Sequence, residues 1–111
     1  MKSQEAIVQT FLNALNNEDF KTAKSCLNDD FSFTGPLGER NGADQYIGDM
    51  EKMKFKYEIE KVFSNDDEVC VIYKIDMLGK AKITTCGLYK LENNKLSSLN
   101  VIFDPRPVLQ K

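Results

Sequence analysis

The chain contains no histidine, so the side chain that most often serves as a general base or a metal ligand is missing from its 111 residues. Any chemistry must rest on carboxylates, tyrosines, lysines or thiols. Cys26, Cys70 and Cys86 are odd in number and lack CxxC spacing, which is typical of reduced, partly buried thiols rather than of a disulfide framework or a zinc site. The glycines form neither GxGxxG nor a phosphate loop. We therefore expect no metal and no cofactor.

Three tyrosines and one acid are the remaining candidates for chemistry. Tyr46, Tyr57 and Tyr73 occupy apolar positions of their segments, which would place three hydroxyls around one cavity as donors to a ligand carbonyl. The alternative is that each ring fills the core while its hydroxyl bonds to the backbone or the edge. Asp104 is either an acid at the rim of that cavity or a carboxylate that pairs with Arg106 and turn amides.

Three segments before residue 54 show helical spacing of apolar residues. Ser3 is a suitable N-cap for the first, which ends at 16–17. The second starts at 18 or 19, points Leu27 inward and closes in 28–30. The third opens at Asn41-Gly42. Its apolar stripe consists of Tyr46, Ile47, Met50 and Met53. Its water-facing residues are Asp44, Asp49, Glu51 and Lys52.

The rest of the chain alternates with a period of two. Residues 31–34 form a strand that ends in a turn at 35–38, and strands follow one another from Phe55 to Asp104. A three-residue turn at 78–80 sorts polar from apolar side chains better than a two-residue turn. It pairs Met77 with Ala81, Ile75 with Ile83, Tyr73 with Thr85, Val71 with Gly87, Asp76 with Lys82 and Lys74 with Thr84.

This register leaves apolar side chains on the face that should meet solvent: Cys70, Ile72, Cys86 and Leu88. An antiparallel sheet with two apolar faces is usually covered twice. The helices are one cover, and a second copy of the chain is the simplest other. We therefore predict a homodimer.

The last strand allows two arrangements. A two-residue turn at Asn93-Asn94 pairs Glu92 with Lys95, and an uninterrupted ladder would then put Leu99, Val101 and Phe103 on the outer face. A bulge at 97–98 would turn these three side chains inward and leave Ile102 on the outer face. The residues alone leave both arrangements open.

Large apolar and aromatic side chains at inward positions either line a cavity or fill the core. Gly87 removes a side chain from this inner face, and we interpret it as a gap or a point of bending. The hydroxyls of Tyr46, Tyr73 and Thr85 would be the few polar contacts of the predicted pocket. Its full lining is predicted as Phe11, Phe33, Tyr46, Met50, Met53, Tyr57, Tyr73, Thr85 and Phe103.

The order of these elements, the Pro-x-Gly exit at 36–38 and the ending 101–105 (Val-Ile-Phe-Asp-Pro) resemble the nuclear-transport-factor-2-like superfamily, in particular its SnoaL-like small proteins. The resemblance covers essentially the whole chain, 1–111, as one domain. It implies an α+β fold of the cystatin-like type, in which a cone-shaped, curved, antiparallel or mixed sheet wraps around three N-terminal helices with an internal pocket. The resemblance also suggests the bulge at 97–98, which we favour because it buries Phe103 in the pocket and leaves Ile102 with the outer apolar residues.

Ketosteroid isomerase, a member of this superfamily, needs a carboxylate base and an oxyanion hole made from a tyrosine and a protonated acid. The resemblance places these three groups at Gly35, Phe11 and, within one residue, Gly87. None of the three residues can perform its role, so we expect the shape of that enzyme without its activity.

The net charge of the chain and its first residues limit the binding partners and the cellular location that we expect. Fifteen basic and seventeen acidic residues are interspersed for a net charge of -2, which argues against a nucleic-acid partner. The start goes directly into an amphipathic pattern, so we expect no membrane association and a cytoplasmic location. Two functions stay open: a dimeric protein that binds a small hydrophobic molecule, or a small isomerase, cyclase or dehydratase acting on a hydrophobic carbonyl compound.

Overall fold

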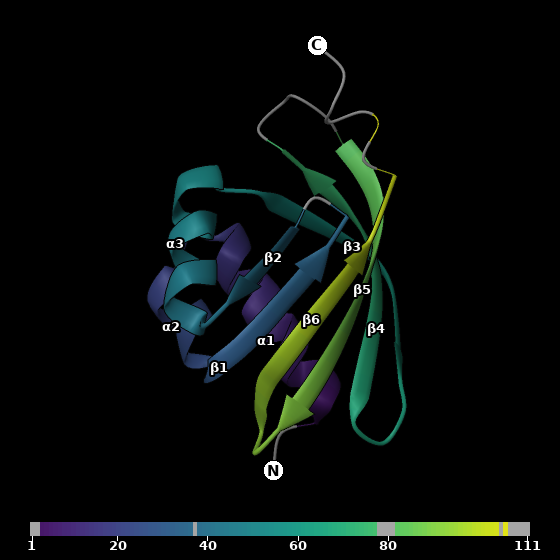
Figure 1. Ribbon diagram of the computed structural model, residues 1–111. Coiled ribbons are helices and arrows are strands. Elements are labelled where there is room, and N and C mark those ends of the chain that lie inside the picture. Colours follow the sequence, from purple (N-terminus) through teal and green to yellow (C-terminus); the bar gives the residue numbers. More distant parts are fainter. Residues whose placement is uncertain (1–2, 37, 78–81, 105, 107–111) are drawn as a thin grey trace.

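The computed structural model describes residues 3–36, 38–77, 82–104 and 106 and has the expected α+β architecture (Figure 1). Three helices precede most of the sheet. They are α1 (Gln4–Asn16), α2 (Phe20–Ser25) and α3 (Ala43–Met53). The six strands are β1 (Leu27–Gly35), β2 (Gly38–Asn41), β3 (Lys56–Ser64), β4 (Glu68–Asp76), β5 (Lys82–Glu92) and β6 (Lys95–Ile102).

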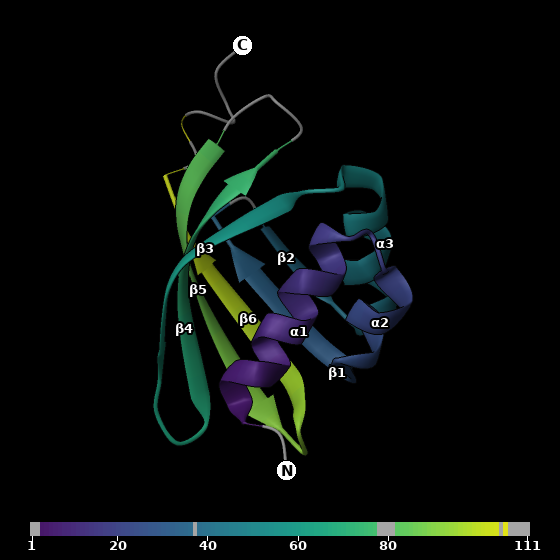
Figure 2. The same cartoon turned by 180° about the vertical axis from the view of Figure 1, so that it is seen from behind.

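The strands form one curved, mixed sheet in the order β2-β1-β6-β5-β4-β3. All neighbours are antiparallel except β1 and β6, which run parallel. The helices lie together on one face of this sheet, with α1 against β3, β4 and β6 and α3 near β1 and β2 (Figure 2). The opposite face of β4, β5 and β6 has no described helix against it.

Side-chain caps start the first two helices where the sequence predicts. The Ser3 hydroxyl accepts a hydrogen bond from the amide of Ala6 at 3.1 Å, and the Asp19 carboxylate accepts one from Thr22 at 3.2 Å. The prediction that the second helix reaches Leu27 is wrong. Leu27 is buried as the first residue of β1, because the helix ends after two turns at Ser25.

The predicted hairpin register is confirmed for every pair in the described part. Val71 faces Gly87, Tyr73 faces Thr85 and Ile75 faces Ile83, with the two polar pairs on the other face. The turn at 78–80 and the partner of Met77 lie outside the described residues. None of the three described helices is long and apolar enough to span a membrane.

The bulge near the end of the sheet is also confirmed. Leu91 pairs with Leu96 and Lys90 pairs with Ser98, so Ser97 has no partner in the ladder. After the bulge, side chains that an uninterrupted ladder would have turned outward point inward instead. Leu99 and Val101 are buried, and Ile102 is 64% exposed on the outer face.

Candidate functional site

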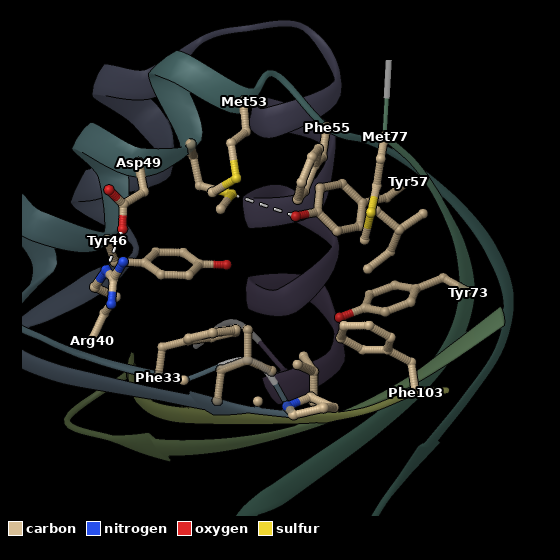
Figure 3. Close-up of a pocket in the computed structure, with 17 residues that line it drawn as sticks. Phe33, Arg40, Tyr46, Asp49, Met53, Phe55, Tyr57, Tyr73, Met77 and Phe103 are labelled. Atoms are coloured by element: carbon tan, nitrogen blue, oxygen red, sulfur yellow. Dashed lines mark hydrogen bonds and ion pairs between the residues drawn. The ribbon is translucent and has the colours of Figure 1, made fainter. Parts of the chain in front are cut away.

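A cavity of about 300 Å³ lies between α3 and one end of the sheet (Figure 3). Its walls come from α3, β2, the start of β3, and the ends of β1, β4 and β6. The lining consists of Phe33, Gly35, Pro36, Gly38, Arg40, Tyr46, Asp49, Met50, Met53, Phe55, Tyr57, Tyr73, Ile75, Met77, Leu99, Val101 and Phe103. This lining is apolar apart from three tyrosines and one ion pair.

Tyr46 projects from α3 and its hydroxyl points into the cavity (Figure 3). Rings from β1 fix its orientation: the centroids of Phe31 and Phe33 lie 5.1 and 5.2 Å from that of Tyr46. Burial, together with the neighbouring Tyr57 and Tyr73, raises the pKa of Tyr46 well above its ordinary value. The group therefore remains a neutral hydroxyl at physiological pH.

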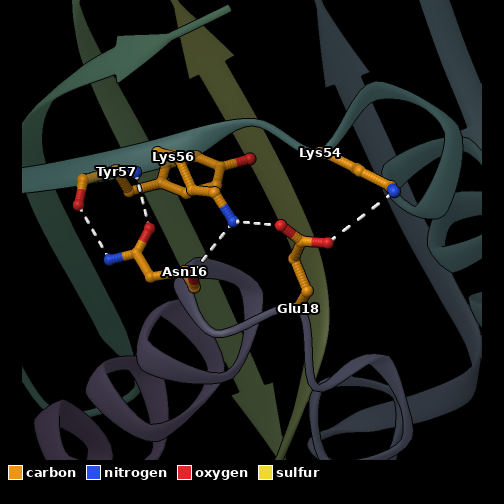
Figure 4. A network of polar contacts seen from close by, with 5 residues as sticks. All are labelled: Asn16, Glu18, Lys54, Lys56 and Tyr57. Carbon is orange, nitrogen blue, oxygen red and sulfur yellow. Dashed lines mark hydrogen bonds and ion pairs between the residues drawn. The ribbon is translucent and has the colours of Figure 1, made fainter. Parts of the chain in front are cut away.

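Tyr57 is positioned by contacts between the end of α1 and the start of β3 (Figure 4). The Asn16 side chain accepts a hydrogen bond from the Tyr57 amide at 2.7 Å and donates one to its carbonyl at 2.9 Å. Lys56 next to it donates to the Asn16 carbonyl and to Glu18, and this lowers the pKa of Glu18. With its backbone held, Tyr57 extends its hydroxyl to the sulfur of Met50 at 3.6 Å.

The third hydroxyl belongs to Tyr73 on β4. Its oxygen lies 2.8 Å from that of Tyr89, which is fully buried on β5. Burial raises the pKa of both groups above the ordinary tyrosine value. Tyr73 thus links the core to the cavity, and its ring lies beside that of Tyr57 with 5.3 Å between centroids.

The space above Gly87 is not the gap that the sequence suggested. A Cβ atom on Gly87 would lie 2.5 Å from the Tyr73 hydroxyl oxygen and 3.1 Å from Cε1 of Tyr89. The missing side chain is therefore replaced by the two phenols, and Gly87 permits their contact rather than leaving room for a ligand.

Arg40 and Asp49 form the polar end of the lining, and the sequence analysis missed both. Nε of Arg40 donates to Oδ2 of Asp49 at 2.7 Å, and Nη1 donates to the carbonyl of Glu39 at 2.8 Å. Asp49 was predicted to face water. It lies instead at the edge of the cavity, because β2 brings Arg40 against the same side of α3.

Most of the predicted pocket residues meet around this cavity: Phe33, Tyr46, Met50, Met53, Tyr57, Tyr73 and Phe103. Phe11 and Thr85 lie elsewhere. Phe11 is buried under the rings of Tyr46 and Tyr89, and the Thr85 hydroxyl donates to the Ile83 carbonyl at 3.1 Å. Both point inward but sit in filled parts of the core, so assigning them to the lining was wrong.

Asp104 pairs with Arg106. Arg106 Nε donates to Oδ1 of Asp104 at 3.0 Å and Nη2 donates to Oδ2 at 2.6 Å, and this pairing lowers the pKa of Asp104. A carboxylate with a lowered pKa is a poor proton donor. No group of three or more carboxylates or thiols arranged to hold a metal occurs among the residues that the structure describes.

The outer face of the sheet carries the apolar side chains predicted for it. Cys70, Ile72, Cys86 and Leu88 are half-buried, and Ile102 is opposite Cys86. The sulfur atoms of Cys70 and Cys86 lie 3.2 Å apart. Phe63, which the sequence analysis did not single out, is opposite Cys70 and 55% exposed. We call these six residues the outer patch.

The place that the resemblance gave to the isomerase base lies in the cavity wall, since Gly35 is part of the lining. A Cβ atom there would meet Val101 at 2.9 Å and Phe33 at 3.2 Å. The wall is therefore closed by apolar side chains at the point where that enzyme needs a carboxylate.

Comparisons with known proteins agree with this fold. A structure of an NTF2-like protein of unknown function from Cytophaga hutchinsonii shares 46% identity over 99% of this chain and 97% of its own, with a TM-score of 0.96. An LEH-like epoxide hydrolase from M. tuberculosis has 21% identity, covering 94% of this chain and 84% of its own, with a TM-score of 0.81. A SnoaL-like polyketide cyclase described as putative, from Shewanella putrefaciens, has 18% identity, coverages of 97% and 84%, and a TM-score of 0.80.

These last two likenesses concern the fold alone. No functionally curated protein sequence matched the chain. The family model described as the SnoaL-like domain matches residues 8–99. The chain therefore belongs to the SnoaL-like domain family, within the NTF2-like group of folds.

Proposed function

We propose that the protein binds a small hydrophobic molecule with a hydrogen-bond acceptor oxygen in the cavity beside α3. The observation that carries this proposal is the convergence of the Tyr46, Tyr57 and Tyr73 hydroxyls in an otherwise apolar lining (Figure 3). Binding pockets for small molecules commonly combine apolar walls with a few placed polar groups.

The protonation of these hydroxyls favours binding over acid-base chemistry. Burial raises the pKa of all three, so each holds its proton at physiological pH and can donate to a carbonyl or hydroxyl oxygen. The carboxylate of the lining, Asp49, is paired with Arg40. A small isomerase, cyclase or dehydratase is the alternative, and Asp49 would then have to leave that pair to accept a proton.

Binding of Nile red, a neutral dye whose emission rises in apolar surroundings, tests the proposal. Met53 is half-buried on α3 and lines the cavity, so Met53→Trp should fill it and abolish the emission increase. The matched control is Lys52→Trp, which puts the same ring on the exposed side of the same helix. Equal dye binding by both variants and the wild type would contradict the proposal, and native mass spectrometry of the protein as purified would identify a retained ligand.

We further propose that two copies associate through the outer patch. Ile102 and Phe63 expose large apolar side chains there, and such patches usually mark interaction sites. A second copy is the favoured occupant because two basic side chains on this face already have acidic partners within the chain: Lys74 lies 3.9 Å from Glu60, and Lys90 lies 3.9 Å from Glu68. A two-fold related copy would bring an equally apolar patch against the outer patch.

Replacing Ile72 by Lys would place an unpaired charge in this contact and should give a monomer in sedimentation experiments. Gln45→Lys on the exposed side of α3 is the control with the same change in charge. A wild-type protein that sediments as a monomer at micromolar concentration would refute the dimer while leaving the ligand proposal standing.

A further inference from the structure

The two charged residues of the cavity lining, Arg40 and Asp49, lie together at one side of it (Figure 3). Arg40 comes from β2 and Asp49 from α3, so their ion pair joins the two elements across this side. The Arg40 side chain is 47% exposed and that of Asp49 is 28% exposed. The charge of Arg40 is therefore accessible from solvent and from the cavity.

Arg40 has hydrogen-bonding capacity that the protein does not use in these contacts. A guanidinium group has five N–H donors, and the bonds to Asp49 and to the Glu39 carbonyl engage two of them, one on Nε and one on Nη1. These two bonds also fix the plane of the group. The remaining donors on Nη1 and Nη2 suit a planar, two-oxygen acceptor.

The polar atoms of the cavity are mostly donors, which decides between an acid and an amine as ligand. The phenols of Tyr46, Tyr57 and Tyr73 keep their protons, and Arg40 adds N–H groups. An amine would find one carboxylate, Asp49, whose Oδ2 already accepts from Arg40. A carboxylate would find donors at the Arg40 end and, further in, hydroxyls for a second oxygen of the ligand.

We propose that Arg40 receives the carboxylate of an amphipathic monocarboxylic acid whose apolar body occupies the cavity. This inference rests on the proposed binding function and specifies its ligand class. The cavity of 300 Å³ holds about ten non-hydrogen atoms if each takes about the volume of a water molecule in the liquid. Medium-chain acids fit this size, and a medium-chain acid with a keto or hydroxyl oxygen would also use the tyrosines.

Three ligands that share one ten-carbon chain separate the possibilities: decanoic acid, 1-decanol and decylamine, each titrated against the protein by displacement of Nile red. We expect the acid to bind about tenfold more tightly than the alcohol at neutral pH, and the amine to bind most weakly. Arg40→Met should remove the preference for the acid and leave the affinity for the alcohol unchanged. Arg40→Lys, which keeps the charge but not the fork, should retain part of the preference.

Arg106→Met is the matched control, because Arg106 is paired with Asp104 outside the lining and its loss should change none of the three affinities. Asp49→Asn removes the competing carboxylate and should tighten the binding of the acid.

Equal affinities for acid and alcohol, or an unchanged preference in Arg40→Met, would overturn the inference while the binding function survives. Preference for the amine would overturn it in favour of Asp49. Failure of all three ligands to displace the dye would overturn it together with the proposed function.

Discussion

Adding one methyl group at Gly87 should disturb the link between the core and the cavity. The new Cβ atom would lie 2.5 Å from the Tyr73 hydroxyl oxygen and 3.1 Å from Cζ of the same ring. Such distances are too short for non-bonded atoms, so the Tyr73 ring must move. That movement breaks its 2.8 Å hydrogen bond with Tyr89 and shifts a hydroxyl of the cavity.

The expected cost has two parts. Overpacking a filled core costs about 1–3 kcal/mol. Leaving the buried Tyr89 hydroxyl without its partner adds about 1–3 kcal/mol. Gly87→Ala should therefore lower the free energy of unfolding by about 2–6 kcal/mol, a large part of the total stability of a domain of this size.

A double-mutant cycle with Tyr73→Phe distinguishes this explanation from a general effect of the sheet. Tyr73→Phe alone should cost about 1–3 kcal/mol, since Tyr89 loses its partner. In the double variant that bond is lost once instead of twice, and the oxygen that the new Cβ would meet is absent. The double variant should therefore be at least about 1–3 kcal/mol more stable than the sum of the two single changes predicts.

Urea denaturation followed by circular dichroism measures all four proteins, with Nile red binding as a second readout of the cavity. Strict additivity of the two changes, or an unchanged denaturation midpoint for Gly87→Ala, would refute the reasoning. Either result would mean that Tyr73 does not lie over Gly87.

Three further outcomes follow from the structure. Asn16→Ala removes both hydrogen bonds to the Tyr57 backbone and should cost about 2 kcal/mol of unfolding free energy, whereas Asn17→Ala on the exposed end of the helix should cost little in the same urea titration. Burial, and to a lesser extent the adjacent Cys86 thiol, raises the pKa of Cys70 to about 11. Its alkylation by iodoacetamide, measured by mass spectrometry, should therefore be slow at pH 7 and should accelerate about tenfold per pH unit up to that pKa. A rate equal to that of a free thiol such as N-acetylcysteine would contradict this. Because Gly35 offers no base, the purified protein should not isomerise a 3-keto-Δ5-steroid, and turnover that a cavity mutation abolishes would show that the equivalent positions are misassigned.

The sheet register could be predicted because both faces of the hairpin carry information. Ile75 and Ile83 belong on one face, while Asp76 and Lys82 belong on the other, and only one turn length satisfies both. The bulge at Ser97 was predicted from the resemblance to SnoaL-like proteins, and its effect is clear in the structure, since an uninterrupted ladder would have moved Leu99 and Val101 out of the core. Where apolar residues alternate with polar ones along a strand, a shift of the pairing register by one residue would move the apolar side chains into water. The alternation in the sequence therefore indicates the register.

Strand β2 could not be found in this way. All four of its residues are exposed, so it has no apolar alternation, and its place is set by pairing with β1. Missing β2 also hid the Arg40–Asp49 pair. Helical periodicity correctly put Asp49 outside the apolar stripe of α3, but without β2 there was no reason to expect a cation or a cavity edge beside it.

The errors at Phe11 and Thr85 have a different origin, because both side chains do point inward. Parity assigns a residue to a face of a strand or a helix, but not to a position along the length of the sheet. On β4, Val71 is packed in the core, whereas Tyr73 and Ile75 line the cavity. Beside α1, at the end that holds Phe11, helix and sheet side chains fill the interior. Beside α3, where β1, β4 and β6 end, they leave it open. A ligand site in this fold is therefore set by how far along each strand an inward residue lies, and that distance depends on the packing of α1 and α3 rather than on any local pattern.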